Sequence, residues 1–208
     1  GAVNTTGAQL AAFGTGALAA NTTGGNNTAL GYQAMDANTT GSANVSVGSN
    51  SLGGNTTGSN NTSVGYDSLV ANTTGELNVA TGKDCLKRNT TGARNTSSGV
   101  YALQNNTTAS DNTAFGYDSL GGNTTGANNT GIGRSALGAN TTGLNNTAVG
   151  RIALSANTTA SNNTAFGSSS LYSNTTGANN TAVGLSALEA NTTASYNVAI
   201  GYHAGKNV

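Results

Sequence analysis

Asn140-Thr-Thr-Gly-Leu-Asn-Asn-Thr-Ala-Val-Gly-Arg-Ile-Ala-Leu-Ser-Ala156 is one unit of a 17-residue pattern that fills the chain. Asn-Thr-Thr returns at the same interval every time, with no insertion or deletion. A short fixed period is the signature of stacked units that contact only their neighbours. The sequence therefore predicts one repeat array over residues 1–208. Its units start at Asn4, Asn21, Asn38, Asn55, Asn72, Asn89, Asn106, Asn123, Asn140, Asn157, Asn174 and Asn191.

The composition would suit a disordered chain if the sequence did not repeat. Only 35% of the residues are hydrophobic and 7% charged, there are 31 glycines, and proline and tryptophan are absent. Such a chain has little apolar area to offset conformational entropy, but identical coils can stack and share a core. The array opens and closes within its pattern, so we expect a segment of a longer protein.

Charge and hydropathy exclude several partners. The formal net charge is zero and no basic stripe is present, so nucleic acid is not an expected partner. No apolar run reaches the roughly 18 residues that span a bilayer, so we expect no membrane insertion in this segment. A single cysteine, Cys85, rules out an internal disulfide framework.

The pattern within one unit favours strands over helix. We number repeat positions 1 to 17 from the Asn of Asn-Thr-Thr. Position 10 is mostly apolar, position 15 is Leu in ten units, position 11 is always Gly, and position 4 is Gly except at Ala109, Ala160 and Ala194. Two apolar anchors are too few for an amphipathic helix, and the glycines would break one. The fold class predicted is all-β: a parallel β-roll or β-solenoid of twelve 17-residue coils.

Each coil is predicted to hold two strands, at positions 7–10 and from 14 through 17 into 1–3, with turns after Gly at positions 11 and 4. Alternation then points positions 8, 10, 15, 17 and 2 inward and positions 1, 3, 7, 9 and 14 outward. Positions 9 and 14 stay small although outward, which predicts contact with another chain, most simply around a three-fold axis. The predicted interface includes Ala29, Ala34, Cys85, Ala148, Ala153, Ala182 and Ala187. In such a homotrimer three Cys85 thiols would lie near the axis.

The motif Asn-Thr-Ala-Val-Gly-x-x-Ala-Leu, at 146–154 and 180–188, alternates with Ser/Ala-Asn-Thr-Thr-Gly, and the chain ends in the same style at 197–207. This resembles the repeats of phage-type tail-fibre-domain proteins and bacterial surface fibres. It is also similar, more loosely, to the head repeats of trimeric autotransporter adhesins. The resemblance covers the whole chain and implies a trimeric β-roll from a virion or cell surface. The 17-residue period departs from the shorter adhesin-head period.

The outward Asn and Thr of Asn-Thr-Thr predict a regular polar row that could meet glycans or ice. Every unit also carries an Asn-x-Thr sequon at its first Asn, and several carry a second, as at Asn26 and Asn60. The alternative is a structural role, in which Asn side chains form hydrogen-bond ladders between coils. The predicted row includes Asn21, Thr23, Asn38, Thr40, Asn55, Thr57, Asn72, Thr74, Asn123, Thr125, Asn140, Thr142, Asn174 and Thr176.

The remaining polar residues suggest no catalytic set, cofactor site or metal site, so we do not expect an enzyme. Charges gather in the fifth and sixth units, and His203 and a row of tyrosines occupy variable turn positions. We expect a structural fibre or adhesin module: a rigid extracellular, cell-surface or virion spacer whose partner is itself and which could also meet cell-surface glycans. The alternatives are a glycosylated extracellular filament subunit and an ice-binding β-solenoid with an Asn/Thr face.

Overall fold

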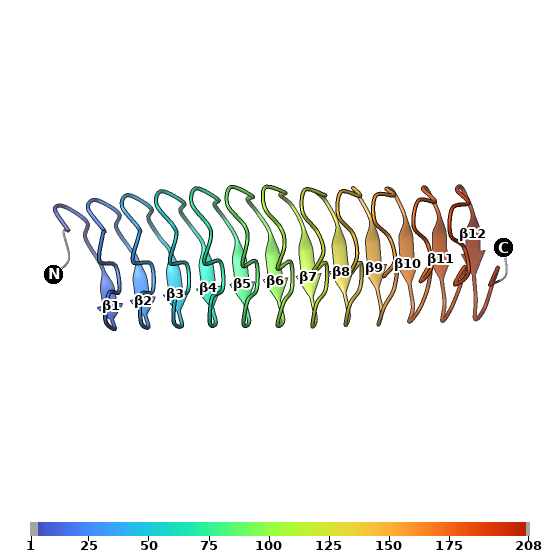
Figure 1. The fold of residues 1–208 in the computed structure, drawn as a ribbon, viewed down its shortest axis with the longest axis horizontal. Coiled ribbons are helices and arrows are strands. Elements are labelled where there is room, and N and C mark those ends of the chain that lie inside the picture. The colour runs from blue at the N-terminus through green and yellow to red at the C-terminus, as the bar shows by residue number, and fades with distance from the viewer. Residues whose placement is uncertain (1–3, 207–208) are drawn as a thin grey trace.

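The computed structural model describes residues 4–206, which wind into a rod of successive coils (Figure 1). Each coil contributes one three-residue strand to a single sheet of twelve strands, and no helix occurs in the described chain. The prediction of an all-β parallel β-solenoid is confirmed. The strands are β1 Ala11–Phe13, β2 Thr28–Leu30, β3 Val45–Val47, β4 Thr62–Val64, β5 Val79–Thr81, β6 Thr96–Ser98, β7 Thr113–Phe115, β8 Thr130–Ile132, β9 Thr147–Val149, β10 Thr164–Phe166, β11 Thr181–Val183 and β12 Val198–Ile200.

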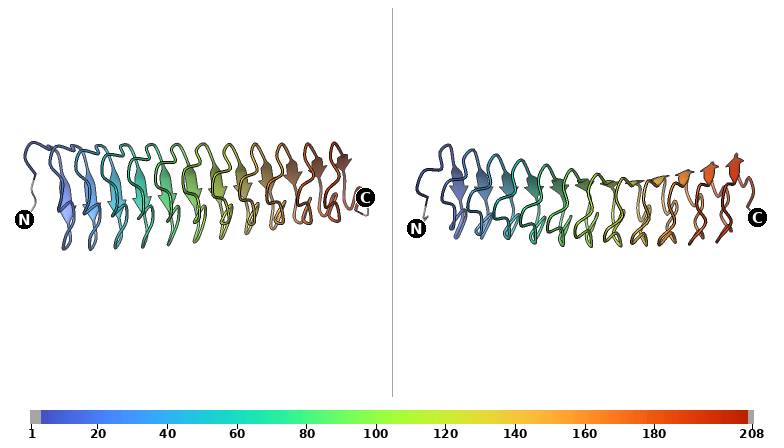
Figure 2. Two further views of the ribbon diagram at one scale, coloured as in Figure 1. Left: turned by 45° about the horizontal axis from the view of Figure 1, so that its top comes forward. Right: turned by 90° about the horizontal axis from the view of Figure 1, so that it is seen from above.

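The strands pair in parallel and strictly in sequence order, from β1 to β12. The register matches equal repeat positions, as in the pairing of Thr147, Ala148 and Val149 with Thr164, Ala165 and Phe166. Every residue therefore lies above its counterpart one unit away. The sheet twists gradually along the rod, as the two further views in Figure 2 show.

The predicted second strand does not form. Positions 12 to 17 form turns and positions 2 and 3 a bend, because positions 13 and 15 adopt left-handed backbone conformations, as at Ile152 (φ 51°) and Leu154 (φ 51°). This side of the coil still bonds to its neighbours: the amide of Leu52 donates to the carbonyl of Ser68 at 2.9 Å. The left-handed conformation costs a non-glycine residue about 1–2 kcal/mol. Burying a leucine side chain, which contributes about 1.5–3 kcal/mol, offsets that cost.

The inward and outward faces of the strand are opposite to the prediction. The side chain at position 9 is buried, and those at positions 8 and 10 are exposed or half-buried, as in β10, where only Ala165 is buried. The predicted core residue Phe166 is 55% exposed. The cross-section is narrow, so Leu at position 15 and small residues at positions 9 and 14 fill it, leaving no room for Phe or Val from position 10. The predicted core role of Leu at position 15 is confirmed, since Leu52, Leu69 and Leu137 are fully buried.

Gly at position 11 is required by two features of the turn. Gly65 has φ +139°, in a region that side-chain-bearing residues rarely adopt. A Cβ added there would lie 2.4 Å from the carbonyl oxygen of Gly82 in the next coil. All twelve units therefore keep Gly at this position.

Candidate functional site

The asparagines at position 1 form a buried ladder along the rod. The Nδ2 of Asn38 donates to the Oδ1 of Asn21 (2.8 Å) and to the carbonyl of Gly41 in its own coil (3.0 Å). The same pair of bonds recurs at Asn55, whose Nδ2 lies 2.8 Å from the Oδ1 of Asn38. These side chains are fully buried. The Asn-Thr-Thr motif is therefore first of all a structural element.

The asparagines of the predicted outward row do not face solvent, because their amides satisfy each other inside the coil. The prediction is wrong for Asn21, Asn38, Asn55, Asn72, Asn123, Asn140 and Asn174, which are all 0% exposed. A glycan could not be attached to these buried amides without breaking the ladder. A second ladder runs through position 7, where the backbone amide of Asn44 donates to the Oδ1 of Asn27 at 3.0 Å. Position 7 was also predicted to point outward, and it too is buried.

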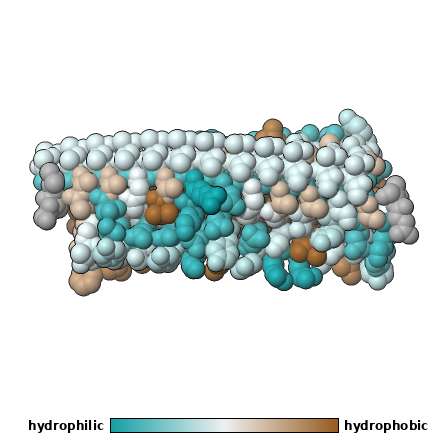
Figure 3. All heavy atoms as spheres, viewed as in Figure 1, coloured by the Kyte–Doolittle hydropathy of each residue, from teal (hydrophilic) through white to brown (hydrophobic). Residues whose placement is uncertain are grey.

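The threonines of the same row do lie on the surface. Thr23, Thr40, Thr57, Thr74, Thr125, Thr142 and Thr176 are exposed. They belong to the bends that form the upper edge of the rod in Figure 1, where Figure 3 shows a regular pale band of side chains. The neighbouring threonine at position 2 is half-buried, and its hydroxyl donates to the position 2 carbonyl of the next coil, as from Thr39 to Thr56 at 3.0 Å. Position 3 is the part of the motif that is left to meet another molecule.

The predicted inter-chain interface is buried inside the single chain. Ala29, Ala34, Cys85, Ala148, Ala153, Ala182 and Ala187 are 0–1% exposed, so their side chains cannot contact another copy. Positions 9 and 14 stay small because they pack against each other across the core: the Oγ of Ser51 donates to the Oγ of Ser63 at 2.8 Å. Cys85 occupies the same place, with its Sγ 2.8 Å from the Oγ of Ser97, and burial raises the pKa of its thiol to about 11. Three Cys85 thiols on a trimer axis are therefore excluded.

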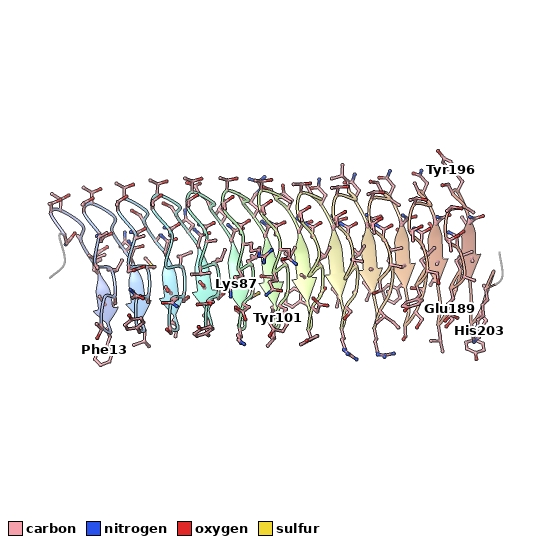
Figure 4. All side chains as sticks on the ribbon, in the orientation of Figure 1. Phe13, Lys87, Tyr101, Glu189, Tyr196 and His203 are labelled. Atoms are coloured by element: carbon pink, nitrogen blue, oxygen red, sulfur yellow. The ribbon has the colours of Figure 1, made fainter. Side chains whose placement is uncertain are left out.

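The outer face of the sheet is uncharged and carries many apolar side chains among threonines, although strand alternation predicts that these side chains lie in the core. Positions 8 and 10 carry no charged residue in any unit. Phe13 points away from the rod at its first strand in Figure 4. The large apolar side chains exposed there by more than a third are Phe13, Leu30, Val45, Val79, Phe115, Ile132, Phe166, Val198 and Ile200. The signal for this face is present in the sequence: the residue at position 9 is always small, which indicates that position 9, and not positions 8 and 10, points into the narrow core.

Several charges of the fifth and sixth units are paired, in part with aspartates of the adjoining fourth and seventh units. The Nζ of Lys87 lies 2.7 Å from Asp84 and 3.1 Å from Asp67, and its hydrogen bond to Asp84 is the chief reason that the pKa of Lys87 is raised. Arg94 forms a two-bond pair with Asp111, at 2.7 and 2.9 Å. These contacts join coils in the manner of a ladder. They do not converge on a hollow.

The side chains in the variable turns cover the edge opposite to the threonines. Tyr32, Tyr66, Tyr117 and Tyr202 are 50–72% exposed, and the rings of Tyr117 and Tyr101 meet edge to face at 5.7 Å. Figure 4 places His203 near Glu189 at the C-terminal end, and Tyr196 on the opposite edge. Within residues 4–206 no group of three His, Cys, Asp or Glu side chains could hold a metal ion.

A hollow of about 500 Å³ lies at the first strand, lined by Leu10, Ala11, Ala12, Phe13, Thr28, Ala29 and Leu30. Its lining is apolar apart from Thr28 and includes no titratable side chain. In the described part of the chain, no helix has the length and apolarity to span a bilayer.

No protein-family model matches the sequence, and neither a characterised protein nor a solved structure shows significant similarity to it. The two surfaces that the chain offers to other molecules, the position 3 threonines and the outer sheet face, are therefore interpreted from their own geometry.

Proposed function

We propose that the chain is a rigid structural rod, a module of an extracellular, cell-surface or virion fibre that holds its ends apart. The observation that carries this proposal is the in-register stacking, in which backbone bonds and two asparagine ladders link each coil to the next. At about 4.8 Å per coil, twelve coils give a rod of roughly 58 Å. A repeat stack without a deep polar cleft suits a spacer better than a catalyst.

The rod is tested by small-angle X-ray scattering. The expected pair-distance distribution is that of an elongated particle whose longest dimension per chain is roughly 58 Å. Removal of one complete unit, residues 123–139, should shorten this dimension by about 4.8 Å and leave the cross-section unchanged. A compact particle, or a cross-section that expands after the deletion, would refute the proposal.

Assembly into a homotrimer is part of the proposal, with the outer sheet face at the three-fold axis. Twelve strands, each about 10 Å long and spaced about 4.8 Å apart, present a gently twisted face of roughly 600 Å², on which apolar side chains are mixed with threonines. Its whole area is comparable with the largest apolar patch on a typical monomer, roughly 300–600 Å². A second copy of the chain suits this face because its strands have the same spacing and its side chains at positions 8 and 10 bring no charge into the contact.

The oligomeric state is tested by sedimentation equilibrium, where we expect three times the 20.2 kDa of one chain. Phe115→Asp combined with Ile132→Asp places two carboxylates on the face and should release monomers. Tyr117→Asp, in the same coil but at position 12, is the matched control and should stay assembled. A wild-type monomer at micromolar concentration would refute the homotrimer and leave the rod proposal standing.

A glycosylated filament subunit is the second candidate, supported by the exposed sequons at position 6. Asn26, Asn60 and Asn128 are exposed, and each is followed two residues later by Thr. Intact-mass measurement of native material tests this candidate. We expect any attached glycan at position 6 and none at the buried position 1, so an unmodified mass would remove the candidate.

A further inference from the structure

The position 3 threonines form a continuous surface feature that the fold itself does not use. We call it the threonine ridge: Thr6, Thr23, Thr40, Thr57, Thr74, Thr91, Thr108, Thr125, Thr142, Thr159, Thr176 and Thr193, all of them exposed. The bends that carry the ridge stay on one edge of the rod from end to end (Figure 1). It is distinct from the sheet face assigned above to assembly.

Four repeat positions are identical in all twelve units, and the structure explains three of them. Asn at position 1 forms the buried ladder, as at Asn38 and Asn55. Thr at position 2 donates its hydroxyl to the next coil, as at Thr56. Gly at position 11 avoids a clash with the next turn, as at Gly65. Position 3 has no such reason, because within residues 4–206 its hydroxyls take part in no intramolecular hydrogen bond.

The choice of threonine itself points to a ligand that uses both the hydroxyl and the methyl group. Positions 5, 9 and 14 exchange Ala and Ser between units, and position 8 exchanges Thr and Val. Position 3 accepts neither Ser, which lacks the methyl, nor Val, which lacks the hydroxyl. Each ridge residue therefore presents one hydrogen-bonding group and one apolar group, repeated at the coil spacing of about 4.8 Å.

The surroundings of the ridge narrow the chemistry of that ligand. Positions 1 to 4 contain no charged and no aromatic residue in any unit, and position 4 is always Gly or Ala. An ionic ligand would find no counter-charge there, and a sugar ring would find no aromatic face to stack on. A neutral lattice whose repeat is close to the coil spacing fits the ridge, and ordered water meets both conditions, because oxygen atoms along one axis of ice recur at nearly this distance.

We propose that the threonine ridge binds ice, by ordering water between its methyl groups and anchoring it through the unpartnered hydroxyls. The ridge carries the contact alone, since the asparagines next to it are buried in the ladder. A water-ordering edge and a spacer can coexist on one rod, because the ridge and the strands lie on different sides of the coil.

Partition of the protein into a slowly growing ice front tests the proposal, with inhibition of ice recrystallisation as the second measurement. The wild-type chain should enter the ice and slow recrystallisation. The ridge variant combines Thr40→Lys, Thr57→Lys and Thr74→Lys, which lift bulky charges above three successive coils. Its effective concentration for recrystallisation inhibition should rise roughly tenfold, the factor that corresponds to about 1.4 kcal/mol.

The matched control places three lysines at position 12 of neighbouring coils: Tyr32→Lys, Ser49→Lys and Tyr66→Lys. Position 12 already holds Lys83, so the control should fold and bind ice like the wild type. A milder ridge variant replaces Thr40, Thr57 and Thr74 by Val, an exchange that position 8 tolerates. It should weaken ice binding by roughly threefold while far-ultraviolet circular dichroism stays unchanged.

Exclusion of the wild-type chain from ice would overturn the proposal, and so would equal partition of the wild type and the lysine ridge variant. Ridge-dependent retention on an insoluble polysaccharide, without entry into ice, would replace ice with a glycan ligand. Scattering of the same samples reports whether the rod persists, so a failure of the ridge proposal is distinguished from a failure of the spacer proposal.

Discussion

Replacing one asparagine of the buried ladder should destabilise the rod far more than replacing the exposed threonine two residues away. Asn123 makes three side-chain hydrogen bonds: its Nδ2 donates to the Oδ1 of Asn106 and to the carbonyl of Gly126, and its Oδ1 accepts from the Nδ2 of Asn140, each at 2.9 Å. Asn123→Ala removes all three and leaves a buried acceptor on Asn106 without its donor. At about 1 kcal/mol for each bond, with a further 1–2 kcal/mol for the unsatisfied partner, the expected loss is about 4–5 kcal/mol.

The assay is urea unfolding followed by circular dichroism, fitted with a nearest-neighbour model because long repeat arrays depart from two-state behaviour. Thr125→Ala is the control, since Thr125 is exposed and makes no side-chain hydrogen bond in the described chain. Its effect should stay within about 0.5 kcal/mol. If Asn123→Ala lost no more stability than Thr125→Ala, the ladder would not hold the coils together and the reasoning would fail.

Three further perturbations test other parts of the rod. Gly65→Ala should destabilise by more than about 2 kcal/mol, because its Cβ would meet the Gly82 carbonyl at 2.4 Å; a melting temperature equal to that of the wild type would contradict this. Cys85 should resist a thiol reagent at pH 8 until urea unfolds the chain, because it is fully buried. Because the pKa of the Cys85 thiol is raised, the thiol's contribution to stability is full below the ordinary thiol pKa of 9.0 and is lost as the pH rises through about 11. Rapid labelling of the native chain would contradict the first expectation, and alkaline unfolding that is the same in Cys85→Ala as in the wild type would contradict the second. Arg94 lowers the pKa of Asp111, so this pair stabilises the fold above the ordinary Asp pKa, and the effect disappears as the pH falls through the lowered value. Both groups are largely exposed, so salt should weaken the effect. An acid titration of stability that is unchanged by Asp111→Asn would count against this prediction.

The period, the strand at positions 8 to 10 and the turn glycines could be predicted from the sequence, because each leaves a signal within a single unit. The second strand could not be excluded, because Leu is not a residue type that indicates left-handed backbone, yet Leu154 adopts it to reach the core. The faces were inverted because a hydrophobic side chain was assumed to point inward. In so narrow a coil the size limit at Ala148 outweighs the hydrophobicity of Val149.

The sequence predicts the candidate surfaces only in part, again because strand alternation does not hold for every residue of the coil. Thr57 was correctly placed outside, whereas Asn55, only two residues earlier, turned inward because the bend at Gly58 brings its amide to that carbonyl at 2.9 Å. Strict strand alternation does not describe a bend. A repeat position that stays small in every unit, such as position 14 at Ala153, correctly indicates close packing, but the packing partner lies in the same chain.

The strict register of the coils makes the length of the rod adjustable in discrete steps. Because each residue meets only its own counterpart one unit away, as Thr147 meets Thr164, duplication or loss of a whole 17-residue unit leaves every contact type intact. A change of any other size would shift the register and place unlike repeat positions over one another in neighbouring coils. Recombination between near-identical repeats in the gene can therefore lengthen or shorten this molecule by one coil at a time, without any compensating mutation.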